Sequence, residues 1–297
     1  MTDPFESIDS VQQALGSERY FADRPIATTV FLAQRLGKPL FLEGEAGVGK
    51  TEVAKVLARL LDTRLIRLQC YEGLDASHAL YEWNYPKQLL RIKLGEGGNA
   101  AELGREIFGE EYLIRRPLLD AITPNGAAPP VLLIDEIDRA DEEFEAFLLE
   151  VLSDFQVTIP ELGTIRATHP PLVVLTSNRT REINDALKRR CLYLWVPCPS
   201  FERELEILRA KVPDLDETLA QQICAFMQIV RDRDFYKRPG VAESIDWARA
   251  LVALHRDTLD PAIVEETLGA IFKYNDDIEA LRSAGIPALL AEVAAAV

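Results

Sequence analysis

The sequence contains no long apolar segment. None of its hydrophobic runs reaches the roughly 18 residues that a helix needs to cross a membrane. The N-terminal stretch MTDPFESIDS is acidic and polar, whereas a secretory signal starts with basic residues and continues with an apolar core. We therefore expect a cytoplasmic protein without a membrane partner. Its 297 residues are enough for one or two hydrophobic cores.

Residues that bind metals or form disulfides are few and dispersed. The four cysteines include no CxxC pair, and the three histidines are isolated from one another. Three of the cysteines lie in apolar runs, which favours reduced, buried thiols over a metal-binding or redox role. The residues concerned are Cys70, Cys191, Cys198, Cys224, His78, His169 and His255.

Positive charge is also scarce. Lys and Arg total 33 against 48 Asp and Glu, which gives a formal net charge of −15. The segment from Phe201 to Val297 has 11 basic and 18 acidic residues, which leaves 22 and 30 before it, so both parts are acidic. Because phosphate contacts require clustered Lys and Arg, we expect no nucleic-acid partner. A narrow basic groove or a basic pore would not change these totals.

Short apolar segments alternate with amphipathic ones up to residue 200. The segment VLLI is apolar at consecutive positions, as in a parallel strand covered on both faces. Segments such as KTEVAKVLARLL and EEFEAFLLEVLSDF have the apolar spacing of helices. Strands that alternate with helices predict an α/β fold with a parallel sheet. The predicted strands are Pro39–Glu43, Arg64–Cys70, Val131–Ile134, Leu172–Thr176 and Leu192–Val196.

The pattern changes after PCPS at Pro197–Ser200. Four later segments, beginning with FERELEILRAKV, repeat apolar residues every three or four positions and predict a helical bundle. We therefore expect an α/β core over residues 1–200 and an all-α domain over residues 201–297. The stretches EGGNAA (Glu96–Ala101) and TPNGAAPP (Thr123–Pro130) predict loops within the core.

A complete G-x-x-x-x-G-K-[ST] motif follows the first predicted strand and opens a helix. Its defining residues are Gly44, Gly49, Lys50 and Thr51. Glycines permit a turn that aims main-chain N–H groups at phosphate oxygens, and the helix N-terminus favours negative charge. Lys50 is expected to reach the β- and γ-phosphates and Thr51 to hold Mg²⁺. The alternative is a glycine-rich turn with an exposed lysine. The other candidate nucleotide contacts are Glu45, Ala46, Gly47, Val48 and Glu52.

Two acids end the buried strand VLLI. Asp135 is expected to accept the water shell of Mg²⁺, and Glu136 to polarise the attacking water. Helix capping is the alternative, because acids in a first helical turn are stabilised by the macrodipole. Capping explains Asp141, Glu142 and Glu143 better than it explains two acids placed directly on a strand end.

The next strand also ends in polar residues, TSN. Asn178 would lie beside the acids in a parallel sheet, where it can orient the lytic water or sense the γ-phosphate. The alternative is an asparagine that forms a turn.

A run of three positive charges precedes the fifth predicted strand. We expect one of these arginines, Arg190 rather than Arg189, to reach a γ-phosphate held by an adjacent subunit. Such an arginine finger can raise the rate by about 10³–10⁵. A solvated charged face is the alternative for Lys188, Arg189 and Arg190.

Together these elements resemble an AAA+ P-loop NTPase. The segments LEGEAGVGKTEVAK, LLIDEIDRADEEFEAFLLEVL and LTSNRTREINDALKRRCLYLW are similar in sequence to the MoxR family. The resemblance covers nearly the whole chain. Within that family it is most similar to the CoxD-type chaperone-like ATPases that accompany aerobic carbon monoxide dehydrogenase.

The resemblance implies a five-stranded parallel sheet sandwiched by helices and followed by an all-α lid domain. It also implies a homo-oligomeric ring, usually a hexamer, with ATP at the subunit boundaries. The family's Walker A lysine and threonine match Lys50 and Thr51, its Walker B acids match Asp135 and Glu136, and its sensor asparagine matches Asn178. Arg190 matches the arginine of the family's DRF segment.

One part of the family's pattern is missing. MoxR proteins often have a second-sensor arginine in an SPR segment of the lid, but the matching stretch PGVAE contains no arginine. Either Arg238 or Arg249 substitutes for it, or the chain lacks this role and couples lid closure to hydrolysis differently.

The resemblance implies an ATPase that remodels other proteins. MoxR relatives commonly work with von Willebrand factor A-domain proteins to mature or activate metalloenzymes, and the implied client is a molybdenum hydroxylase of the carbon monoxide dehydrogenase type. ATP is expected rather than GTP, because the NKxD pattern of guanine-specific GTPases is absent. Two insertions are candidate client-binding elements: the segment with Tyr81, Trp83 and Tyr85, and FQVTIPELGTIRATH, which predicts a hairpin. The alternative is that these aromatic side chains close a local core.

Two other functional classes share the phosphate loop. A P-loop small-molecule kinase closes a lid over an acceptor and needs no arginine from a neighbouring subunit. A nucleic-acid-dependent AAA+ motor would turn over ATP faster when DNA is present, and the acidity of the chain predicts no such effect.

Overall fold

The computed structural model describes residues 4–94, 100–123 and 128–297. Much of the two predicted loops at Glu96–Ala101 and Thr123–Pro130 lies outside these ranges. The chain forms two compact units. The sheet unit comprises Met1–Val11, Pro25–Glu43 and Ala54–Leu194, and the lid unit comprises Gln12–Arg24, Gly44–Val53 and Trp195–Val297. The division into domains at residue 200 stays a prediction.

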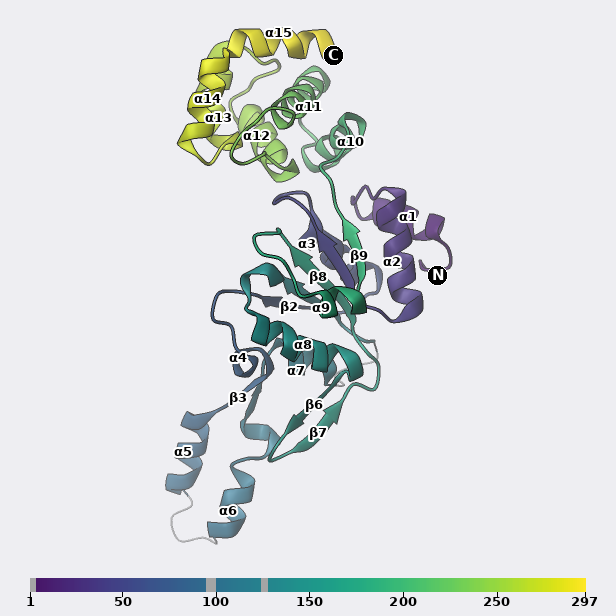
Figure 1. Cartoon of the computed structure of the whole chain (residues 1–297), viewed down its shortest axis with the longest axis vertical. Coiled ribbons are helices and arrows are strands. Elements are labelled where there is room, and N and C mark those ends of the chain that lie inside the picture. The colour runs from purple at the N-terminus through teal and green to yellow at the C-terminus, as the bar shows by residue number, and fades with distance from the viewer. Residues whose placement is uncertain (1–3, 95–99, 124–127) are drawn as a thin grey trace. The chain divides into compact units, whose positions relative to one another are not determined.

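A five-stranded sheet in the order β2-β5-β8-β1-β9 forms the centre of the sheet unit (Figure 1). The pairings β2–β5, β5–β8 and β8–β1 are parallel, which confirms the predicted α/β class. Each predicted strand is present with ends within two residues of the expected ones. The strands are β1 (Leu40–Glu43), β2 (Leu65–Gln69), β5 (Val131–Asp135), β8 (Leu172–Ser177) and β9 (Leu192–Trp195).

The strand register brings polar residues together at the carboxyl ends of the strands. Gln69 lies beside Asp135, and Glu43 lies beside Ser177. Because parallel strands end on the same side, the carboxyl ends of β2, β5, β8 and β1 meet there.

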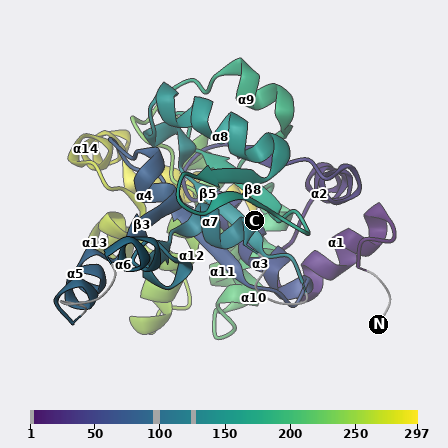
Figure 2. The ribbon, with the colours of Figure 1, turned by 90° about the horizontal axis from the view of Figure 1, so that it is seen from below.

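Helices cover the sheet through apolar side chains. All five residues of β5 are buried, as expected for a central parallel strand. One core cluster joins Leu132 and Ile134 of β5 to Phe144 and Leu148 of α8. Figure 2 shows α8 and α9 on the same side of β5 and β8. Apart from the helices between α4 and α7, those before β9 are α1 (Ile8–Ser17), α2 (Arg24–Leu36), α3 (Lys50–Leu60), α4 (Ala76–Leu80), α7 (Pro117–Ile122), α8 (Glu142–Asp154) and α9 (Asp185–Arg190), with a short 3₁₀ turn η2 at Ile137–Arg139.

An insertion separates α4 from α7. Its strands β3 (Tyr81–Trp83) and β4 (Leu113–Arg115) pair antiparallel, and α5 (Tyr85–Leu94), α6 (Ala100–Glu106) and the 3₁₀ turn η1 (Glu110–Tyr112) lie between them in sequence (Figure 1). The second insertion is the predicted hairpin, with β6 (Gln156–Ile159) antiparallel to β7 (Gly163–Arg166).

Of the two alternatives for Trp83, a client contact and a local core, the structure shows the local core. The Trp83 side chain is only 8% exposed and packs edge-to-face on Phe108, with ring centroids 5.3 Å apart. It belongs to a local core with Tyr112 and Leu119, because the insertion needs apolar anchors of its own. Tyr85 remains 59% exposed.

The segment after residue 200 is all-α, as predicted. Its helices share one core, in which Phe226 packs on Trp247 with centroids 4.9 Å apart. Ser200 and Asp216 accept main-chain N–H groups at the starts of α10 and α11, as N-caps do. The helices are α10 (Phe201–Lys211), α11 (Glu217–Arg231), α12 (Val241–Ala253), α13 (Pro261–Ile271), α14 (Asn275–Ala284) and α15 (Ile286–Ala296). None of the helices over the described ranges has the length and apolar character that a membrane crossing requires.

Candidate nucleotide site

The phosphate loop runs from the end of β1 into α3 and belongs to the lid unit. Gly47 and Gly49 have φ values of +78° and +94°, in the left-handed region that side chains rarely adopt. Gly44 is needed for a different reason, since a Cβ there would lie 2.3 Å from the carbonyl oxygen of Val196. The loop thus has the backbone that a phosphate cradle requires, followed by a helix N-terminus.

Lys50 is buried within this loop. Its side chain is 6% exposed, and Nζ donates to the carbonyl oxygens of Gly44 at 2.8 Å and of Glu45 at 2.7 Å. The exposed lysine of the alternative interpretation is therefore not observed. An ammonium group held by loop carbonyls can exchange them for phosphate oxygens without leaving the loop.

The lid unit places further residues beside the loop, none of which was predicted from the sequence. A Cβ on Gly49 would lie 3.7 Å from the ring of Tyr20, whose pKa is raised by burial and by the charges of Asp23 and Glu52. The main-chain N–H of Ala242, at the start of α12, donates to the carbonyl oxygen of Gly47 at 3.1 Å. No sequence motif marks these residues.

The two possible replacements for the second-sensor arginine differ in their surroundings. Arg249 is 59% exposed and lies 3.8 Å from Asp246 on the same helix. Arg238 is exposed in the segment before α12, directly ahead of Pro239. Whether either one senses nucleotide stays a prediction.

Asp135 sits at the buried end of β5 and is held from two sides. Its side chain is 3% exposed. Thr176 on β8 donates from Oγ1 to Asp135 Oδ1 at 2.5 Å, while Arg67 on β2 donates to Oδ2 from Nε at 3.0 Å and from Nη2 at 2.6 Å. Neighbouring strands therefore fix the orientation of the carboxylate, and neither partner was predicted from the sequence.

Glu136 adopts an uncommon backbone conformation. Its φ and ψ are 55° and 51°, in the left-handed region that non-glycine residues rarely adopt and that often marks functional sites. Its main-chain N–H donates to Thr176 Oγ1 at 3.0 Å. Gln69 donates to Glu136 Oε2 at 3.1 Å, and Arg139 approaches the same oxygen at 2.8 Å. Capping does not account for Glu136, because no side-chain capping bond forms at that position; Asp141 instead caps α8 by accepting from Phe144 N.

Asn178 lies just beyond β8 and is oriented by Asp138. The main-chain N–H of Asn178 donates to Asp138 Oδ1 at 3.2 Å, and Thr180 donates to Oδ2 from N at 2.9 Å and from Oγ1 at 2.6 Å. Asp138 is 4% exposed. Asp138 is the third acid of the DEID segment, which is visible in the sequence. Its role in orienting the backbone of Asn178 follows only from the fold.

The arginines of the predicted finger lie on α9. Arg190 donates from Nη1 to the carbonyl oxygen of Leu149, on α8, at 2.7 Å. Arg189 is exposed at the next-to-last position of α9. The start of α9 is anchored by buried Glu145, which accepts from Asn184 N at 2.7 Å and pairs with Arg181.

Cys70 directly follows β2, beside the acids. Its main-chain N–H donates to the carbonyl oxygen of Asp135 at 2.9 Å. Burial, followed by the negative charges of Asp135, Asp138 and Glu136, raises the pKa of the Cys70 thiol to about 12. A thiol with that pKa is protonated and unreactive at neutral pH, as the sequence analysis expected.

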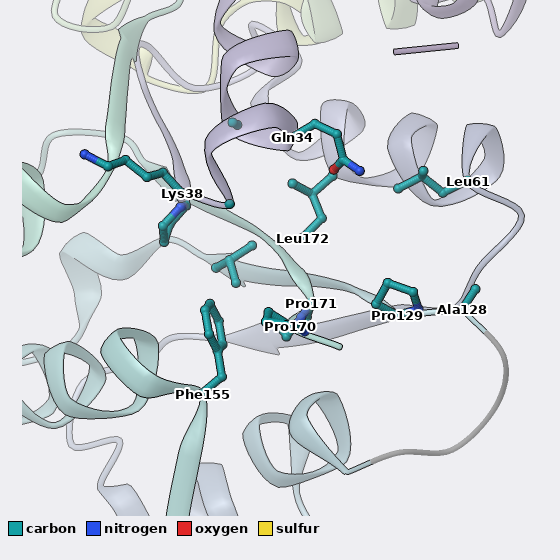
Figure 3. Close-up of a pocket in the computed structure, with 13 residues that line it drawn as sticks. Gln34, Lys38, Leu61, Ala128, Pro129, Phe155, Pro170, Pro171 and Leu172 are labelled. Carbon is teal, nitrogen blue, oxygen red and sulfur yellow. The ribbon is translucent and has the colours of Figure 1, made fainter. Parts of the chain in front are cut away.

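A cavity of about 250 Å³ lies at the opposite end of the strands from the acids (Figure 3). Lys38 and Gln34 are its polar lining residues, and Pro129, Pro170 and Phe155 are among the apolar ones. It lies at the amino ends of the strands, whereas ligands of parallel sheets bind at the carboxyl ends. We therefore place no part of the nucleotide site in it.

A complete phosphate loop and a buried parallel strand that ends in two acids are the two halves of a P-loop nucleoside triphosphatase. The chain belongs to the AAA domain (dynein-related subfamily) family, whose model matches residues 39–191. It is therefore an AAA+ ATPase.

Similar proteins of known function include an ATPase and chaperones. The chain is 26% identical over 288 residues to the gas vesicle ATPase GvpN of Haloferax mediterranei, covering 91% of this chain and 80% of that one. It is 30% identical over 196 residues to the mitochondrial chaperone protein ClpB3 of Oryza sativa, covering 65% of this chain and 16% of that one. The RuvB Holliday junction branch migration motor of Thermotoga maritima superimposes with a TM-score of 0.45 at 16% identity, over 89% of this chain and 71% of that one. The fold is defined by the family match and by the strand order of the sheet, independently of the similarity to RuvB.

Proposed function

We propose that this chain is a Mg²⁺-dependent ATPase whose turnover remodels a client protein. The donors fit the metal, because Mg²⁺ takes oxygen ligands and keeps several waters, so one or two protein oxygens are enough. Thr51 and Asp135 would supply them. Once bound with ATP, Mg²⁺ would neutralise charge on the β- and γ-phosphates.

The other steps fall to residues of this chain. Lys50, together with the loop amides, would bind the β- and γ-phosphates. Glu136 would orient and polarise the attacking water, and Asn178 would fix the water or the γ-phosphate. Arg190 or Arg189 of a neighbouring subunit would stabilise the charge on the phosphate, which requires the chain to assemble, and we propose a hexameric ring.

The exposed apolar surface of α5 is the observation that carries the remodelling proposal. Leu89, Leu90 and Leu94 are 59%, 58% and 75% exposed, whereas Gln88 is the buried residue of the helix and donates to Ile107 O at 2.7 Å. Arg91 pairs with Glu106 of α6 at 2.6 Å, which holds α5 with its leucines outward. Clustered exposed leucines on a helix are a feature of protein-binding surfaces.

The client proposal is more specific. We propose a molybdenum hydroxylase of the carbon monoxide dehydrogenase type, matured or activated together with a von Willebrand factor A-domain protein, as in the CoxD-type group. This proposal is supported by the amino-acid sequences of the motifs and by the insertion that exposes α5. The similarity to the chaperone ClpB3 supports work on proteins in general.

Capture of the client tests the proposal. Glu136→Gln should hold ATP without cleaving it and so retain a client. Lys50→Ala should bind neither ATP nor the client. Each tagged variant is incubated with ATP, Mg²⁺, a purified hydroxylase and a von Willebrand partner, and the bound protein is measured. Retention by Glu136→Gln alone supports the proposal. Equal retention by both variants, or none by either, contradicts the client assignment.

A further inference from the structure

The phosphate loop and the start of α12 meet backbone against backbone within the lid unit. Besides the hydrogen bond from Ala242 N to Gly47 O, a Cβ on Gly240 would lie 2.4 Å from the carbonyl oxygen of Ala46 and 3.0 Å from Cα of Gly47. Gly240 itself has φ −86° and ψ −172°, an extended conformation open to any residue. Its lack of a side chain is therefore required by the approach to the loop and not by its own backbone.

A buried ion pair lies behind this contact. Arg231 of α11 donates to the two carboxylate oxygens of Glu204, on α10, at 2.6 Å and 2.7 Å. Ser244 of α12 donates to Glu204 and accepts from Arg231. Arg231 is 6% exposed, and Glu204 and Ser244 are fully buried. Three lid helices are thus joined through one guanidinium group.

A further donor of Arg231 reaches the contact itself. Its Nε donates to the carbonyl oxygen of Pro239 at 2.8 Å, one residue before Gly240. Glu243 Oε2 accepts from Gly240 N at 2.9 Å, which fixes the turn from its other side. A buried ion pair often stabilises a fold no more than apolar residues of the same volume do, so its geometry is the more informative feature. That geometry anchors the Pro239–Ala242 turn.

We infer that Arg231 is a positioning residue for nucleotide binding. Through the Pro239 carbonyl it holds the turn against Ala46 and Gly47, and the turn holds the phosphate loop. Because the C=O and N–H of one peptide point in opposite directions, the bond from Ala242 N to Gly47 O turns the N–H of Val48 away from α12. The loop is thereby kept in one conformation before nucleotide arrives, which lowers the entropic cost of binding. The inference concerns nucleotide binding and is independent of the client.

The first test separates the contact from the stability of the lid. Gly240→Ala introduces a methyl group against Ala46, whereas Gly269→Ala on α13 introduces one with no atom within 4 Å. Binding of a fluorescent ADP analogue with Mg²⁺ is measured by titration on the full chain, and thermal unfolding without nucleotide is followed by circular dichroism. We expect Gly240→Ala to bind ADP about tenfold more weakly, corresponding to about 1.4 kcal/mol, and Gly269→Ala to bind normally. Normal binding by a folded Gly240→Ala variant would overturn the inference.

The second test links the contact to Arg231. Arg231→Lys keeps the charge but cannot reach both Glu204 and the Pro239 carbonyl with one planar group. Measured well below its unfolding temperature, this variant should also bind ADP about tenfold more weakly, and it serves alone if Gly240→Ala does not fold. The double variant should bind no worse than either single one, since both act through one contact. Normal ADP affinity in folded Arg231→Lys, or effects that add in full, would show that Arg231 only stabilises the lid.

Discussion

Arg67 donates two hydrogen bonds to the same carboxylate oxygen of Asp135, at 3.0 Å and 2.6 Å, across two adjacent parallel strands. Arg67 is half exposed while Asp135 is almost fully buried, so the guanidinium covers the acid from the solvent side. A cation that uses Asp135 must compete with this arginine.

Replacing Arg67 should therefore strengthen the response to Mg²⁺. For Arg67→Met we expect the Mg²⁺ concentration that half-saturates ADP binding to fall about threefold to tenfold, since a partly exposed charged hydrogen bond contributes about 1 kcal/mol. Arg64→Met is a matched control, because Arg64 is also on the surface and pairs with Asp120 at 3.4 Å. Binding is titrated with Mg²⁺ at fixed nucleotide, and an unchanged midpoint in Arg67→Met would contradict the competition.

Substitutions of Glu136 and of an acid in the first turn of α8 should distinguish a catalytic carboxylate from a helix-capping one. Glu136→Gln is expected to lower ATP turnover by about 10²–10⁴ while nucleotide affinity stays near that of the unchanged chain, because a general base acts on water and not on binding. Glu142→Gln, in the first turn of α8, should leave turnover nearly unchanged. Phosphate release and equilibrium binding are measured together. Near-normal turnover in Glu136→Gln would remove Glu136 as the residue that activates water.

The two arginines of α9 should differ in effect. Arg190→Ala is expected to reduce turnover by about 10³ or more if it is the finger, and Arg189→Ala to reduce it far less. Because Arg190 also bonds to Leu149 O, loss of activity alone does not distinguish the finger from an anchor of α9. Mixing Arg190→Ala with Lys50→Ala subunits should restore part of the activity if the arginine acts on a neighbour. Absence of recovery would leave Arg190 as an anchor of α9.

The exposed leucines of α5 should matter for a client and not for ATP. Leu89→Gln with Leu90→Gln should leave basal ATP turnover unchanged and abolish retention of the client by the Glu136→Gln variant, since apolar anchors supply most of the affinity of a protein interface. Leu36→Gln is the matched control, because Leu36 is also 59% exposed but lies on α2. Undiminished client retention by the α5 variant would exclude this helix as the binding surface.

The thiols should be unreactive in the folded chain. Burial raises the pKa of both Cys70 and Cys191 to about 12, so at pH 8 each remains a neutral thiol, and becomes a thiolate only as the pH approaches that value. Treatment with a chromogenic disulfide reagent should label at most the partly exposed Cys198 rapidly, and all four cysteines after denaturation. Rapid labelling of Cys70 in native protein would contradict the burial of the β2 end.

Much of the site was accessible from local sequence. The strands before Gly44 and through Asp135 were predicted within two residues, because a buried parallel strand is apolar at consecutive positions and its polar end is abrupt. The hairpin at Gln156–Arg166 was also predicted from the segment FQVTIPELGTIRATH. For Trp83 the sequence left a client contact and a local core as alternatives, since an aromatic residue in an insertion has the same sequence pattern whether it is buried or exposed.

By itself the sequence determined the phosphate loop, the strand-end acids and the helical character of the C-terminal segment, because each depends on residues within one or two turns of chain. The tertiary structure alone decided which side chains hold those residues in place. Arg67 meets Asp135 across 68 positions, and Asp138 orients the backbone of Asn178 across 40. Such contacts depend on strand order and on helix packing, which set which distant residues become neighbours and leave no periodic trace in the sequence.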